Sequence, residues 1–174
     1  MTSVGARSGM QNTTGNYNSF VGYDAGESNT TGESNTFIGD SAGRETTTAS
    51  NNTAVGQSAL LANTTGTRNT AVGALTLDTS TTGDQNTAVG YGAMDANTTG
   101  SNNVAIGDAA LASNTTASNN TAVGDDALKF NTTGHSTIAV GTGAGQAVTT
   151  GTHNVYLGLE AGYGGTTATR LTTG

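Results

Sequence analysis

The chain has 174 residues, of which 27 are glycine and none is proline, cysteine or tryptophan. Five Lys and Arg residues stand against twelve Asp and Glu residues, giving a formal net charge of −7, so we expect no nucleic-acid partner, which would require clustered cations. The absence of cysteine excludes a disulfide framework and a thiolate metal site, and no apolar run is long enough to predict insertion into a membrane.

A repeat of 17 residues runs through the whole chain. Its most regular feature is a glycine that follows Val, Ile or Leu, called here the marker glycine. The marker glycines are Gly5, Gly22, Gly39, Gly56, Gly73, Gly90, Gly107, Gly124, Gly141 and Gly158. This period is too short for a helical hairpin. It predicts an all-β fold, a parallel β-solenoid (β-roll) of ten 17-residue coils, with residues 1–174 as a single repeat domain.

The elements of each coil follow in a fixed order. The segment N-T-A-V, as in residues 52–55, predicts a short strand because it is β-branched and alternating. The marker glycine then turns the chain, and T-T-G, as in 64–66, marks a second corner where glycine can adopt a positive φ. Asn stands four residues before the marker in eight coils, which predicts stacked Asn ladders. Ten coils at the interstrand spacing of ~4.8 Å would form a rod of roughly 48 Å.

Alternation along the strand places Val with Thr on one face and Ala with Asn on the other. We expect the aliphatic side chains to face the interior of the coil. The predicted inner column is Val55, Val72, Val89, Ile106, Val123 and Val140. One such side chain per coil is a small gain against the cost of ordering 17 residues, about 1–2 kcal/mol each. A single chain is therefore expected to need a partner.

The column two residues before the marker is the candidate surface for a homotrimer. It contains Phe20, Phe37, Ala54, Ala71, Ala88, Ala105, Ala122 and Tyr156. Small residues in the middle would allow close approach of backbones, and the larger residues would plug the axis near the ends. The alternative is that these aromatic residues cap the interior of one chain.

Two segments, GSNNVAIGDAAL (100–111) and GTRNTAVGAL (66–75), resemble the head repeats of trimeric autotransporter adhesins and of phage-type trimeric tail fibres. The resemblance extends over all ten coils. It implies a left-handed β-roll and a homotrimeric structural or adhesive fibre, located outside the cell or on a virion. Its implied partners are a cell-surface glycan or receptor and further fibre domains. The T-T-G segment makes these coils longer than the adhesin repeat. Because no signal peptide, stalk or anchor is evident, we expect a fragment of, or partner in, a longer fibre.

The sequence contains little that predicts chemistry. His135 and His153 lack further ligands at metal-binding spacing, and we interpret them as surface residues. Tyr23 and Tyr91 share the column after the marker and are candidates for stacking on a glycan. Several N-T-T and N-N-T triplets match the glycosylation sequon, but a chain rich in Asn and Thr generates such triplets by composition. We predict no enzyme activity and no cofactor.

The alternative function is a monomeric, Thr-rich solenoid that binds ice. Thr occupies both the eighth and the ninth position after the marker in every coil, from Thr13-Thr14 to Thr166-Thr167. In an extended strand, two adjacent Thr side chains would point to opposite faces. This arrangement argues against a flat array of Thr hydroxyls at that corner.

Overall fold

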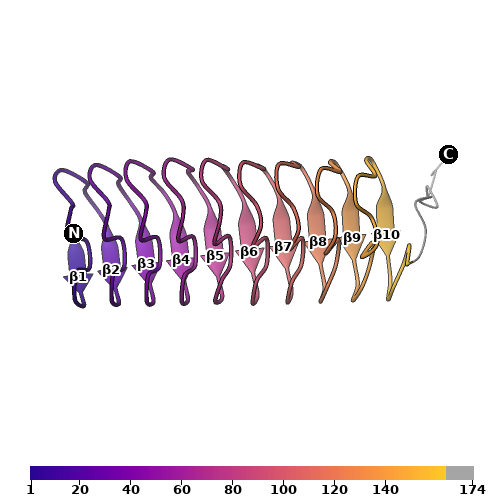
Figure 1. Cartoon of the computed structure of the whole chain (residues 1–174), viewed down its shortest axis with the longest axis horizontal. Coiled ribbons are helices and arrows are strands. Elements are labelled where there is room, and N and C mark those ends of the chain that lie inside the picture. The colour runs from indigo at the N-terminus through magenta and orange to yellow at the C-terminus, as the bar shows by residue number, and fades with distance from the viewer. Residues whose placement is uncertain (164–174) are drawn as a thin grey trace.

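The computed structural model describes residues 1–163 and shows a parallel β-solenoid with one short strand in each coil (Figure 1). The fold predicted from the 17-residue repeat is thereby confirmed. The strands are β1 (Thr2–Val4), β2 (Ser19–Val21), β3 (Thr36–Ile38), β4 (Thr53–Val55), β5 (Thr70–Val72), β6 (Thr87–Val89), β7 (Val104–Ile106), β8 (Thr121–Val123), β9 (Ile138–Val140) and β10 (Val155–Leu157). The described residues outside these strands form turns and loops.

All ten strands belong to one parallel sheet, and their order in the sheet is their order in the sequence (Figure 1). Each strand residue pairs with the residue 17 positions further along. Thr53 of β4 pairs with Thr70 of β5, and Ala54 pairs with Ala71. This register is the same at every step, so identical positions of the repeat stack directly on each other.

Hydrogen bonds between coils continue where the strands end. Around the loop after β4, Leu60 N donates to Thr76 O at 2.9 Å and Ala62 N donates to Asp78 O at 2.9 Å. At the T-T corner, Thr64 N donates to Thr81 O at 3.0 Å. A coil with only three strand residues is therefore bonded to its neighbour around most of its circumference. This bonding satisfies backbone groups that a small interior would otherwise leave unpaired.

The interior is formed by the middle residue of each strand and by the residue four positions after the marker. The middle residues from Phe20 to Ala139 are fully buried, and Tyr156 is 3% exposed. Opposite them lies the corner column, the position four after the marker, which is Leu or Met in the central coils. Its members there are Leu60, Leu77, Met94, Leu111 and Leu128, all fully buried. Each of these five has a positive φ between 51° and 56°, a conformation that L-residues normally avoid and that here turns the side chain inward.

The structure reverses the predicted facing of the strands. The column predicted to be inside lies on the outer face: Val55, Val72, Val89, Val123 and Val140 are half-buried, and Ile106 is 40% exposed. The column predicted to be a trimer surface lies inside: Phe20, Phe37, Ala54, Ala71, Ala88, Ala105 and Ala122 are fully buried, and Tyr156 is almost so. The reason is space, because the Leu or Met of the corner column already fills the interior and leaves room for only an Ala methyl group opposite.

The aromatic residues follow the same rule of size. Where the strand residue is Phe, the corner residue is Gly: Phe20 occurs with Gly26 and Phe37 with Gly43. A Cβ added at Gly43 would lie 2.5 Å from the Phe37 ring. The two Phe rings stack with centroids 5.2 Å apart. These aromatic residues pack in the interior of a single chain, which was the alternative reading of the column.

This size rule predicts that the Phe37–Gly43 pair can be replaced by the Ala–Leu pair of the central coils. Phe37→Ala alone is expected to destabilise the protein by about 3–5 kcal/mol through a cavity, and Gly43→Leu alone by about 1–3 kcal/mol through overpacking. The double variant recreates the central pair Ala54–Leu60, whose Leu has the same φ as Gly43 (56° against 57°), and should recover most of the loss. Denaturant unfolding of the four proteins measures the coupling. Additive losses would contradict the size rule.

Two columns of buried Asn side chains support the corners. The Asn four residues before the marker connects coils: Asn52 N donates to Asn35 Oδ1 at 3.0 Å, and Asn52 Nδ2 donates to Gly66 O at 2.9 Å. The predicted Asn ladder is therefore confirmed, with side chains bonded chiefly to backbone. Such bonds remove the penalty of burying a carboxamide.

The second Asn column, seven residues after the marker, is interrupted. Where it is continuous, Asn114 Nδ2 donates to Asn97 Oδ1 at 2.8 Å. Where the next coil has Ser80 instead of Asn, the buried Oδ1 of Asn63 lacks a hydrogen-bond partner among the described residues. The Oδ1 atoms of Asn29 and Asn131 are unpaired in the same way. In the coil after each of them, the equivalent position is Thr46 and Val148, respectively.

Completing this column should stabilise the rod. In Ser80→Asn, the new Nδ2 is placed to donate to Asn63 Oδ1, and the new Oδ1 is placed to accept from Asn97. We expect a gain of about 1–2 kcal/mol in the free energy of unfolding, because an unsatisfied buried acceptor acquires a partner. Ser80→Ala is the matched control: it removes the Ser80 hydroxyl, which is itself buried without a partner among the described residues, but leaves Asn63 Oδ1 unpaired, and it should gain less stability than Ser80→Asn. A Ser80→Asn protein no more stable than wild type would contradict this account of the unpaired oxygen.

Candidate interaction surface

The outer face of the sheet is the most regular surface of the molecule. We call it the strand face, and it consists of the first and third residues of the ten strands. None of these twenty residues is charged, although the chain has 17 charged residues. Most are half-buried by their own neighbours, and the large apolar ones remain open: Ile38 is 41% exposed and Ile138 46%. A charge-free band composed mainly of Val, Ile and Thr therefore runs along the rod.

The strand face differs from both surfaces considered from the sequence. Its Val column was predicted to be core, and its Thr column, which includes Thr53, Thr70 and Thr87, was not considered as a site. The sequence shows that these two columns lack charged residues, and this signal could have identified the strand face. Contiguous exposed apolar surface of this kind is typical of an interaction site.

The two tyrosines proposed for glycan stacking are exposed but separate. Tyr23 is 53% and Tyr91 61% exposed, each in the position after its marker glycine. They lie four coils apart, roughly 19 Å at the interstrand spacing. The Arg7 guanidinium lies 5.2 Å from the centroid of the Tyr23 ring. The structure thus offers two single aromatic surfaces and does not bring these side chains together.

The histidines come together as a pair. The rings of His135 and His153 are edge-to-face with centroids 5.2 Å apart, and both residues are exposed. Within residues 1–163 there is no group of three or more His, Cys, Asp or Glu side chains placed to hold a metal ion. In the same part of the chain no helix is long and apolar enough to cross a membrane.

The two Thr residues of each T-T pair have different roles. The hydroxyl of the first donates to the carbonyl of the next coil, as from Thr64 Oγ1 to Thr81 O at 3.1 Å. The second, such as Thr65, is exposed. Neither belongs to a strand, so the expectation of opposite strand faces does not apply here. This corner presents a single file of exposed Thr side chains, whereas the strand face presents Thr and Val columns side by side.

Asp78 and Asp95 occupy the same position in adjacent coils. Partial burial raises the pKa of both carboxyl groups, and for Asp78 the neighbouring Asp95 charge raises it further. The Oδ1 atom of Asp78 is buried without a hydrogen-bond partner in the described part of the chain. The ionised pair therefore opposes folding.

This pair predicts a pH dependence of stability. Because the folded state binds these protons more tightly than the unfolded state, their destabilising effect is absent in acid and appears as pH rises through the raised pKa values. We expect Asp78→Asn to raise the melting temperature at pH 7 and to have no such benefit at pH 3. The control is Asp108→Asn, an exposed position. An equal benefit at both pH values would contradict the prediction.

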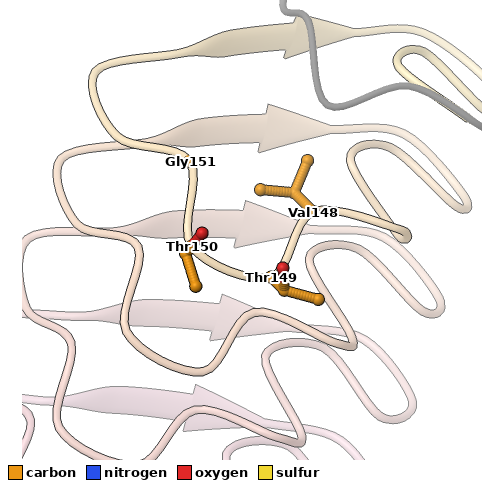
Figure 2. Close-up of a pocket in the computed structure, with 4 residues that line it drawn as sticks. All are labelled: Val148, Thr149, Thr150 and Gly151. Atoms are coloured by element: carbon orange, nitrogen blue, oxygen red, sulfur yellow. The ribbon is translucent and has the colours of Figure 1, made fainter.

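One shallow hollow lies near β10. Val148, Thr149, Thr150 and Gly151 line it (Figure 2). It occurs where Val148 replaces an Asn of the second column. None of these four lining residues is charged. Comparisons of the chain with protein-family models, with curated proteins and with solved structures found no match.

Proposed function

We propose that this protein is a structural fibre component: a stiff solenoid rod that assembles as a homotrimer through its strand face. The single observation that carries the proposal is the charge-free strand face, which extends over all ten coils with a constant register. A surface that repeats at each coil is best matched by a partner with the same repeat. Another copy of this chain has that repeat. The trimeric state follows from the resemblance to adhesin heads and tail fibres.

The mechanical role follows from the bonding between coils. Backbone bonds and Asn ladders connect each coil to the next, and no insertion interrupts them. A rod of this kind would hold a receptor-binding domain away from its base outside a cell or on a virion. The exposed rings of Tyr23 and Tyr91 would contribute contacts to a cell-surface glycan. We propose no enzymatic role and no cofactor.

Light scattering after size exclusion tests the assembly. A mass about three times the 17.1 kDa of one chain is expected. Val89→Asp places a charge on the strand face, where Val89 is half-buried, and should give a folded monomer. Gln57→Asp is the matched control, because Gln57 is exposed in a column that has Asp40, Asp108 and Asp125 in other coils. A wild-type monomer would overturn the proposal.

Ice binding is the second candidate, and the strand face favours it. There Thr53, Thr70 and Thr87 stack at the interstrand spacing, beside a parallel column of Val. Regular rows of hydroxyl and methyl groups on a charge-free sheet can order water. If the protein is a folded monomer, thermal hysteresis in concentrated solution, lost in Thr70→Lys, would support this function. Absence of hysteresis in the monomer would exclude it.

A further inference from the structure

The structure separates the eight Asn-x-Thr sequons of the chain into two groups. Six have the sequence N-T-T, and their Asn residues belong to the second buried Asn column. These are Asn12, Asn29, Asn63, Asn97, Asn114 and Asn131; all but Asn12 are fully buried. Each of the six Nδ2 atoms donates a hydrogen bond, as from Asn63 Nδ2 to Gly66 O at 3.0 Å. Their sequons serve the fold and offer no free carboxamide.

The other two sequons are open. Asn51 and Asn119 begin the N-N-T sequons, and both residues are exposed. Their backbone is fixed by the preceding coil, with Asn51 N donating to Glu33 O at 3.0 Å and Asn119 N to Ser101 O at 3.1 Å. Both have a left-handed φ, 62° and 64°, in the turn that precedes a strand. Neither side chain has a hydrogen-bond partner within residues 1–163.

The Thr that completes each open sequon is half-buried and therefore partly accessible. Thr53 and Thr121 are the first residues of β4 and β8, and they face outward. A transferase that reads the sequon needs both the carboxamide and this hydroxyl. The two sites occupy the same position of the repeat, four coils apart, so sugars attached there would lie in one line along the rod, roughly 19 Å apart.

We propose that the folded chain is an acceptor for N-linked glycosylation at Asn51 and Asn119, and at no N-T-T sequon. The donor is a nucleoside-diphosphate-activated hexose, used by a sequon-reading N-glycosyltransferase. The Asn Nδ2 attacks the anomeric carbon, the bond from that carbon to the diphosphate breaks, and the nucleoside diphosphate leaves. The proton lost from Nδ2 passes to a base of the transferase. No oxidant or reductant is required.

The experiment incubates the folded chain with such a transferase and its activated hexose, followed by intact mass and peptide mapping. We expect a gain of two hexoses, one on Asn51 and one on Asn119. Asn51→Gln and Asn119→Gln should each remove one. A heat-denatured sample, in which the N-T-T sites are modified, shows that the enzyme reads those sequons. Hexose on an N-T-T Asn of the folded chain would overturn the proposal. The absence of hexose from Asn51 and Asn119 in both wild type and the monomeric variant Val89→Asp would also overturn it.

The chain provides a matched control at Asn102. This residue is exposed, has a φ of 59° and occupies the same column, but Asn102-Asn103-Val104 is not a sequon. Val104→Thr introduces the residue that most coils have at this position, and should add a third hexose, at Asn102. A Val104→Thr chain with no third hexose would contradict the idea that exposure in this column makes a sequon competent.

The proposal is independent of trimer formation, although Thr53 and Thr121 belong to the strand face. The incubation is therefore repeated with Val89→Asp, the variant designed to remain monomeric. Modification of this variant alone would support the proposal and place glycosylation before assembly. Failure in both proteins would overturn glycosylation and leave the assembly proposal unaffected, because that proposal is tested by mass.

Discussion

Replacing Gly90 by alanine is expected to disrupt the fold locally and to lower the free energy of unfolding by about 3–5 kcal/mol. Gly90 has a φ of 136°, which L-residues rarely adopt. An added Cβ would lie 2.3 Å from the carbonyl oxygen of Gly107 in the next coil. Because the obstacle is backbone in a stacked coil, it cannot move without breaking the register. Thermal and denaturant unfolding followed by circular dichroism measure the loss.

Gly92→Ala is the control for this variant. Gly92 also has a positive φ, 60°, but a Cβ there would have no atom within 4 Å. Ala109 occupies the equivalent position one coil further on, with a φ of 49°. We expect a change within about 1 kcal/mol, since the conformational strain is small and there is no clash. Equal losses for the two alanine variants would mean that stacking of the marker glycines does not control the register.

Ala88→Asp is expected to prevent folding, whereas Val89→Asp should leave the coil folded. Ala88 is fully buried and stacks between Ala71 and Ala105. A carboxylate there would have no partner, and an unpaired buried charge costs several kcal/mol. Val89, the next residue, points outward and is half-buried. Solubility, circular dichroism and the melting curve distinguish the two outcomes. A stable Ala88→Asp protein would contradict the facing of the strands in this structure.

This pair of variants separates folding from assembly. A charge at position 88 tests the interior of a single coil, while a charge at position 89 tests the surface that we propose is shared between copies. If Val89→Asp is folded and monomeric and wild type is larger, the strand face is the interface. If both proteins have the same larger mass, assembly uses another face of the rod.

The sequence by itself determined the architecture. A 17-residue period without insertions requires stacked coils of equal length, and N-T-A-V places the strand because it is β-branched and alternates. The corner at the marker glycine and a ladder of stacked Asn were also predicted. The Asn column was, however, expected on the side opposite the predicted interior. The positive φ expected at the T-T-G glycines occurs at the marker glycines instead. The sequence further showed that Val and Thr share one side of the strand, and Ala and Asn the other.

Only the tertiary structure decided which of these two sides is inside. By hydrophobicity alone, Val89 is a better core residue than Ala88, so the prediction from the sequence was reversed. The interior is limited by the opposite wall, where Met94 and its equivalents project inward from a left-handed corner, and only a methyl group fits between them. The Asn column joins the Ala column inside because its carboxamides are paired there: Asn86 N donates to Asn69 Oδ1, and Asn86 Nδ2 donates to Gly100 O. Which side of the strand is buried depends on the space that the opposite wall of the coil leaves for side chains. The alternation of residues along the strand carries no information about that space.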